Sequence, residues 1–168
     1  MTRSSGQLRR ALLWTVLTAC VLTAAPTADA TVPTDGRAAA KKSRVYVAHI
    51  DPDPVPAGGN LTVRVLLVNE GPNATGNSFT VSVTLPQNVV ATGRFFPAGC
   101  LSNLTGTSVT CAFPSGLGNQ RTAAVLVPAR VSPTVPAHSK LSGGMATVTN
   151  PDDPDAKVRT VTFGIRVA

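Results

Sequence analysis

Strict alternation of apolar and polar side chains is the feature that most constrains this chain. In the segment 79–85, Phe79, Val81, Val83 and Leu85 alternate with threonine and serine. A period of two places one set of side chains in a core and the other in solvent only in a β-strand. The pattern recurs along the chain, with turn residues between the segments. We expect strands over 44–50, 61–68, 79–85, 89–95, 108–113, 121–131, 140–150 and 158–167.

The composition agrees with an all-β fold. Among 168 residues, only 14% are charged and 4% aromatic, with 14 Gly and 14 Pro. This balance excludes a coiled coil or a charged disordered chain, and the length suits one modest domain. Seven or eight short strands with frequent turns predict an immunoglobulin-like Greek-key β-sandwich over residues 44–168. Pro128 is expected at an edge or a bulge, and Gly143-Gly144 at a β-bulge.

Residues 1–30 have the pattern of a secretory signal peptide. Arginines at positions 3, 9 and 10 precede an apolar run over 11–25, and Ala28-Asp29-Ala30 follows. A run of about fifteen residues is short for a hydrocarbon core of ~30 Å. We therefore expect cleavage after Ala30, export, and no membrane span in the mature chain.

A second interpretation of the leader involves Cys20. Leu17-Thr18-Ala19-Cys20 is similar to a bacterial lipobox, in which Cys20 would carry a lipid anchor. The apolar stretch continues past this cysteine, which favours ordinary cleavage. The expected location is extracellular, with cell-wall association or lipid anchoring through Cys20 as alternatives.

The chain is basic, with 15 Lys and Arg against 8 Asp and Glu. Removal of residues 1–30 takes three arginines and one aspartate, which leaves 12 basic and 7 acidic residues. Several of the basic residues fall in the segment 31–43, which we interpret as a basic flexible linker. Such a segment is either a solvated spacer or a contact for polyanionic wall polymers.

Cys100 and Cys111 are the only cysteines that remain after cleavage. In an exported chain, such a pair predicts a disulfide. Closing so short a loop contributes ~3 kcal/mol in the chain-entropy view. Metal binding or redox chemistry by the pair is disfavoured, because there is no C-x-x-C and no histidine at zinc-site spacing.

The order of several short motifs resembles a bacterial extracellular conserved repeat known as domain of unknown function eleven. The resemblance covers residues from Val45 to the C-terminus and implies an immunoglobulin-like fold, a secreted or wall-associated location and no catalytic residues. Such repeats usually occur in tandem, whereas this chain holds one copy. The matching stretches are Asp53 to Thr62, Val68-Asn69-Glu70-Gly71-Pro72-Asn73-Ala74-Thr75, Thr84-Leu85-Pro86, Gly99-Cys100 with Val109-Thr110-Cys111, and Ala146-Thr147-Val148.

Residues suited to catalysis are few in the mature sequence. It contains no H-E-x-x-H, G-x-S-x-G or phosphate-loop motif, and its only imidazoles are His49 and His138. We therefore expect a non-enzymatic protein. An enzyme with an unrecognised loop site is the rival, and it would gather a histidine with carboxylates in a deep pocket.

Acidic and amide side chains concentrate in two predicted turns. Counting strand reversals places both turns at one end of the sandwich, where calcium would find six oxygen ligands. The alternative is that Asp and Asn beside proline cap local turns. The six residues are Asp51, Asp53, Asn150, Asp152, Asp153 and Asp155.

Phe95 and Phe96 are the only adjacent aromatic pair in a predicted loop. They either form a contact patch or plug the core. Trp or Tyr platforms for sugar and stacking aromatics for nucleic acid are lacking, so we expect no nucleic-acid partner. The sequence thus predicts a secreted interaction module that binds a protein or a polyanionic wall polymer. A secreted inhibitor or adhesin-like ligand is the alternative, and the oligomeric state is left open.

Overall fold

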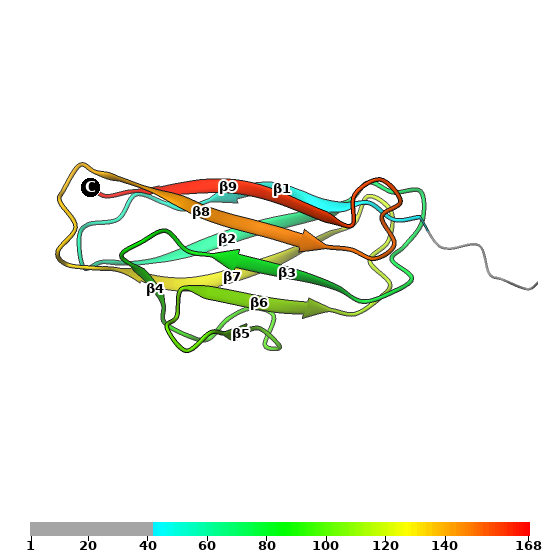
Figure 1. Ribbon diagram of the computed structural model, residues 1–168, viewed down its shortest axis with the longest axis horizontal. Helices are drawn as coiled ribbons and strands as arrows, with labels where there is room; N and C mark the ends of the chain where they lie inside the picture. Colours follow the sequence, from blue (N-terminus) through cyan, green and yellow to red (C-terminus); the bar gives the residue numbers. More distant parts are fainter. Residues whose placement is uncertain (1–41) are drawn as a thin grey trace, which may run out of the picture. The chain divides into compact units, whose positions relative to one another are not determined.

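In a computed structural model of the chain, residues 42–168 form a sandwich of two antiparallel β-sheets (Figure 1). The structure describes these residues only. The predicted signal peptide, the predicted linker up to residue 41 and Cys20 lie outside the described residues. The strands are β1 (Val45–Asp51), β2 (Asn60–Asn69), β3 (Phe79–Thr84), β4 (Val89–Ala91), β5 (Leu101–Ser102), β6 (Ser108–Phe113), β7 (Thr122–Val131), β8 (Lys140–Thr149) and β9 (Val158–Arg166).

One sheet has the strand order β1-β2-β7-β4 and the other β5-β6-β3-β8-β9. The first order matches the ABED sheet of a constant-type immunoglobulin domain, and β3-β8-β9 match its CFG sheet. The β5–β6 hairpin adds to the free edge of β3. The predicted immunoglobulin-like β-sandwich is confirmed by this connectivity.

The core lies between the sheets and consists mainly of valine. Alternate residues of the central strands are fully buried, among them Val63 and Val65 of β2 and Val125 and Val127 of β7. Burial of each such side chain contributes about 1.5–3 kcal/mol. Phe79 stacks on the half-buried Phe113 with ring centroids 5.0 Å apart. The alternation in the sequence therefore marks the core directly.

Successive strands run in opposite directions, so the connecting loops divide between two ends of the sandwich. The chain enters at Lys42 and leaves at Ala168, at opposite ends (Figure 1). We call the end formed by residues 42–44, 70–78, 114–121 and 150–157 the entry end. The end formed by residues 52–59, 85–88, 103–107 and 132–139 is the exit end.

The predicted β-bulge at Gly143-Gly144 is present, whereas Pro128 lies at no bulge and in a strand, β7, that has a neighbour on each side. β8 shifts register against β9 between Leu141 and Gly144, and Gly143 has a φ of 90°, which favours glycine. Pro128 lies within β7, but its carbonyl accepts a hydrogen bond from Thr92 just beyond the last residue of β4. The missing N–H of Pro128 therefore faces the side where the neighbouring strand has already ended.

Two segments differ from the prediction. β4 ends at Ala91 instead of continuing to Phe95, because the chain leaves β7 opposite Pro128 and returns only at a bridge between Phe96 and Leu126. β5 was not predicted, since two residues are too few to show a period. It pairs Leu101 with Thr110 of β6.

Candidate functional site

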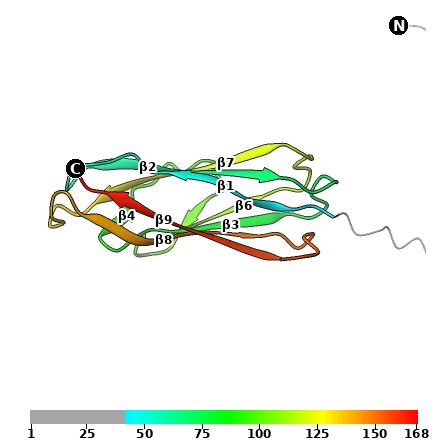
Figure 2. The same cartoon turned by 90° about the horizontal axis from the view of Figure 1, so that it is seen from above.

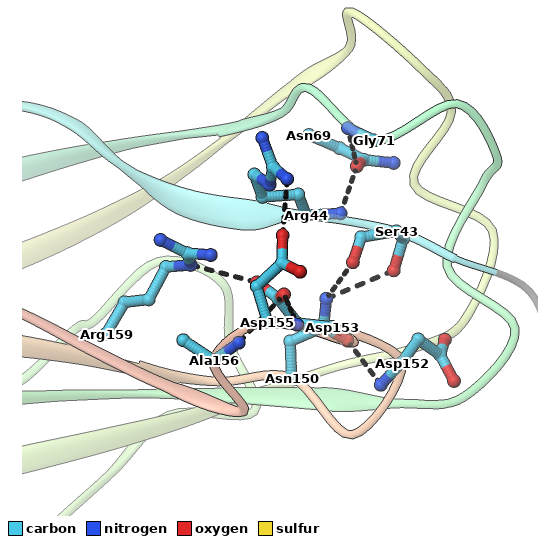
Figure 3. Close-up of polar contacts among 10 residues, drawn as sticks. All are labelled: Ser43, Arg44, Asn69, Gly71, Asn150, Asp152, Asp153, Asp155, Ala156 and Arg159. Atoms are coloured by element: carbon cyan, nitrogen blue, oxygen red, sulfur yellow. Dashed lines mark hydrogen bonds and ion pairs between the residues drawn. The ribbon is translucent and has the colours of Figure 1, made fainter.

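The turn between β8 and β9 carries four of the six residues predicted to bind calcium. Asn150 is buried, and its side-chain amide donates to the carbonyl and the hydroxyl of Ser43 at 3.3 and 3.1 Å (Figure 3). The amide oxygen accepts a hydrogen bond from the backbone N–H of Asp152. Asn150 thus fastens the turn to the segment that enters β1.

Asp153 is also buried, with 1% of its surface exposed. Its Oδ1 accepts hydrogen bonds from the backbone N–H groups of Asp155 and Ala156, and its Oδ2 accepts one from Arg159 Nε at 2.9 Å (Figure 3). Burial acts to raise the pKa of this carboxyl, but the bonds from Arg159, Ala156 and Asp155 outweigh it and hold the pKa below its usual range. The same contact with Asp153 raises the pKa of Arg159.

The remaining carboxylates of the turn also bind groups of the protein. Asp152 accepts hydrogen bonds from the backbone N–H groups of Gly76 and Asn77, at 2.6 and 2.9 Å, and one from the Asn77 side chain. Asp155 forms an ion pair with Arg44 (Figure 3). Asn150 and Asp153 thus cap backbone groups of their own turn, whereas Asp152 and Asp155 bond to distant segments; calcium binding here stays a prediction. A cation here would have to displace N–H donors that already neutralise the carboxylates.

The prediction that both acidic turns share one end is wrong. β1 runs from the entry end, beside Asn150, to Asp51 at the exit end, and a seven-residue strand spans roughly 20 Å. Asp53 follows Asp51 at the exit end, so neither can join Asn150, Asp152, Asp153 and Asp155 in one site. The unpredicted β5 adds one reversal of direction, which moves the last turn to the other end.

Asn69 lies at the entry end, in the stretch Val68 to Thr75 that carries the resemblance, but nothing in the sequence indicated its role. It is fully buried, and its Oδ1 accepts hydrogen bonds from the N–H groups of Arg44 and Gly71, both at 3.0 Å. Its Nδ2 donates to the carbonyls of Asn73 and Leu117, at 2.9 and 2.8 Å. All four hydrogen-bonding positions of the amide are occupied.

Gly71 and Thr75, in the same stretch Val68 to Thr75, also hold segments of the entry end together. A Cβ on Gly71 would lie 2.5 Å from the backbone nitrogen of Arg44, so only glycine fits there. Thr75 is buried, and its hydroxyl accepts hydrogen bonds from the N–H groups of Gly116 and Leu117. The motif quoted for the resemblance is therefore a clamp that holds three segments of the entry end together.

The cysteine pair forms the predicted disulfide, which joins Cys100 to Cys111 across the β5–β6 hairpin. Apolar side chains are exposed around it. Leu101 is 75% exposed, and Leu104, at the tip of the hairpin, is fully exposed. Phe96, in the loop that leads to Cys100, is 55% exposed.

Phe95 and Phe96, predicted either to plug the core or to form a contact patch, differ in their burial. Phe95 is half-buried and packs against the core, as expected for a plug, whereas Phe96 is exposed. Of the two phenylalanines, only Phe96 is therefore exposed enough to take part in a contact patch. Whether a partner binds there stays a prediction.

The two histidines lie on separate elements. His49 is an exposed residue of β1, and His138 lies in the loop between β7 and β8. Among the side chains that the structure describes, no three His, Cys, Asp or Glu residues gather in a way that could hold a metal ion. Residues 42–168 also contain no helix long and apolar enough to cross a membrane.

Comparison with known proteins shows likeness in structure only. No protein-family model matches the sequence, and no curated protein matches it. The resemblance to domain of unknown function eleven therefore has no support from a family match.

Two solved structures of the major pilin subunit of Bacillus cereus, BcpA, align with 75% of this chain at 14% identity, with TM-scores of 0.51 and 0.50. The aligned region spans 40% of the pilin chain. A protein from Nocardia farcinica with an immunoglobulin-like fold aligns with 67% of this chain and 80% of its own, at 24% identity and a TM-score of 0.42. These likenesses concern the fold.

Proposed function

We propose that this chain is an exported, non-enzymatic module of the bacterial cell surface that acts by making contacts with a protein or a polyanionic wall polymer. The observation that carries the proposal is the use of the polar residues at the entry end. The carboxylates of Asp152, Asp153 and Asp155 accept hydrogen bonds from backbone or arginine donors. The buried amides of Asn69 and Asn150 accept hydrogen bonds from backbone N–H groups and donate to backbone carbonyls. Groups that could perform chemistry are used to hold the sandwich together.

Four further points support an extracellular location. The Cys100–Cys111 disulfide suits an oxidising compartment. The sequence begins with the pattern of a signal peptide. The solved structures with a similar fold include a pilin subunit, and the motifs quoted above resemble those of a repeat found in secreted proteins.

An adhesin-like ligand or secreted inhibitor is the second candidate, and the β5–β6 hairpin favours it. The disulfide fixes the base of this hairpin, while Leu101 and Leu104 project from it into solvent. Phe96 lies exposed on the loop that precedes Cys100. A rigid loop with exposed apolar anchors is a common way to bind a protein partner, because little conformational freedom is lost on binding.

Intact-mass spectrometry of the protein after export tests location and disulfide together. We expect a chain that begins at Thr31 and gains two hydrogens on reduction. A mass that shows a lipid on Cys20 would support the anchored alternative. An unprocessed chain in which Cys100 and Cys111 are both free thiols would contradict an exported module.

Binding to isolated cell-wall material and to purified envelope proteins tests the contact role. The hairpin variant Leu104→Asp is compared with Asn119→Asp, which makes the same change in charge in an exposed turn at the entry end. Loss of binding with Leu104→Asp alone would identify the hairpin as the contact. Equal binding by both variants would exclude it.

A further inference from the structure

The outer edge of β9 is the longest strand edge of the two sheets. Of the four edge strands, β4 has three residues, β5 has two, and β1 is interrupted by a register shift between Val47 and His49. Short length and bulges are the usual protections of an edge. β9 has nine residues and is the outermost strand of its sheet (Figure 1).

The backbone groups that β9 turns outward can be assigned from its hydrogen bonds. The carbonyl of Lys157 and the N–H of Val167 bond to the chain on the β8 side, through Asn150 and Ser139. The carbonyl of Arg166 instead accepts from Val55, on the opposite side. Odd-numbered residues therefore bond to β8 and even-numbered residues face outward.

Val55 occupies only the last of the outward positions. Among the described residues, no backbone hydrogen bond reaches the outward N–H and carbonyl groups of Val158, Thr160, Thr162 and Gly164. The side chains along this stretch carry no charge between Thr160 and Ile165. Val161 and Val158 are 40% and 57% exposed. Figure 2 views the sandwich from the side on which β9 and β1 lie.

We propose that β9 pairs antiparallel with β9 of a second copy of this chain, around a two-fold axis at Val161. In this register Thr160 lies opposite Thr162 of the other copy, and Val158 lies opposite Gly164. Every free N–H and carbonyl of the four outward positions then has a partner. A register shifted by two residues in either direction leaves part of this set unpaired or competes with Val55.

Arg166, at the end of β9, favours the antiparallel arrangement. Antiparallel pairing places Arg166 of one copy opposite Ala156 of the other, which lies between Asp155, whose side chain is 57% exposed and pairs with Arg44, and the exposed Lys157. A parallel arrangement in register would place the two copies of Arg166 side by side, and likewise the two copies of Lys157. The exposed Val161 would be covered by its own symmetry mate.

Cysteine cross-linking tests the register, with protein expressed as the full chain and purified after export. Val161→Cys places the two new thiols on directly opposite residues, with Cα atoms about 4.5 Å apart in this type of pair. The matched control Val158→Cys places them roughly 20 Å apart along the paired strands. We expect a disulfide-linked dimer with Val161→Cys and very little with Val158→Cys.

A proline variant tests whether the backbone edge makes the contact. Thr162→Pro removes an outward N–H and leaves the bonds to β8 intact, which edge strands tolerate. Each copy loses one hydrogen bond, so the dimer loses two. We therefore expect the dissociation constant of the dimer to rise about ten- to a hundredfold. Sedimentation equilibrium measures the effect, and far-ultraviolet circular dichroism checks that the variant is folded.

Three results would overturn the proposal. They are a wild-type protein that stays monomeric at millimolar concentration, equal cross-linking by the two cysteine variants, and a folded Thr162→Pro variant that dimerises as the wild type does. A monomer whose outward amides resist hydrogen exchange would show that another segment of the same chain covers β9 instead. None of these results would affect the proposed contact role, because that role depends on the hairpin and on export.

Discussion

The two ends of the sandwich carry similar acidic, proline-rich turns that are bonded very differently. At the entry end, Asp152 and Asp153 bind N–H donors on neighbouring segments and on the turn itself. At the exit end, Asp53 is exposed and makes no hydrogen bond or ion pair with the residues that the structure describes. There, backbone bonds between Val55 and the end of β9 close the sandwich. The role of such a turn therefore depends on the segments that the topology brings to it.

Among the variants that test this comparison, Asn69→Ala is expected to lose the most stability. The change leaves two N–H groups and two carbonyls, all buried or partly buried, without partners, and we expect the free energy of unfolding to fall by about 3–4 kcal/mol. Asn73→Ala is the control, because Asn73 is exposed in the same loop and its side chain has no bond in the described region. Urea unfolding measures both. A loss below about 1 kcal/mol for Asn69→Ala would mean that water replaces the amide.

Asp153→Ala should have the next largest effect. It removes the acceptor for Asp155, Ala156 and Arg159, although Arg159 remains partly exposed and can be hydrated. We expect a loss of about 2–3 kcal/mol by urea unfolding. Asp153→Asn keeps the shape and an acceptor for the backbone, and should cost about half as much. If Asp153→Ala and Asp153→Asn lost the same stability, the acceptor that asparagine keeps for the backbone of the turn would contribute nothing.

The same carboxylate makes stability depend on pH. Its pKa in the folded state lies below the unfolded value of ~3.9, so the unfolded chain takes up the proton first as the pH falls. The stabilisation is present above the unfolded pKa and is lost as the pH falls through the folded pKa. Urea unfolding between pH 6 and 2, in steps of about one unit, should show a smaller decrease for Asp153→Asn than for the wild type. Parallel curves would contradict this account.

Asp152→Ala and Asp53→Ala compare the two turns directly. Asp152 bonds to an exposed loop, so its loss should cost about 1 kcal/mol. Asp53→Ala should change the free energy of unfolding by less than about 0.5 kcal/mol. Thermal unfolding of both variants under one condition gives the comparison. The distinction between the two ends would be lost if Asp53→Ala were the more harmful change.

The smallest expected effect is that of calcium. Since the carboxylates of the entry end already bind N–H donors and arginines, millimolar calcium should shift the melting temperature by less than about 1 °C. A magnesium titration is the control for general ionic strength. A clear shift with calcium alone would show that the ion displaces these donors, and would restore the calcium interpretation for Asn150 and its neighbours.

The sequence predicted the strands well wherever alternation was long. The segments around Val63, Val81 and Val127 show the period clearly, because each buries one face against the other sheet. It could not predict β5, whose two residues owe their pairing to β6 and the disulfide. That single omission reversed the direction assigned to the later strands and placed the acidic turns at one end.

The site was less predictable than the fold. Asn69 belongs to a motif that was noticed, yet its partners Leu117 and Arg44 are far away in the sequence. No local sequence pattern shows that one side-chain amide will form hydrogen bonds with three segments of the chain. Likewise, only packing separates the plug Phe95 from the exposed Phe96, since the two are adjacent and chemically identical.

The placement of Lys42 and Ala168 at opposite ends affects how the sandwich responds to mechanical tension. A pull on the two ends acts along the strands, so the ladders that join β1 to β2 and β9 to β8 are loaded in shear. In that geometry many hydrogen bonds must break together, whereas a pull across the sheet would open them one at a time. A sandwich of this design would resist extension by its topology, and the hydrogen bond from the N–H of Arg44 to Asn69 would anchor the start of β1.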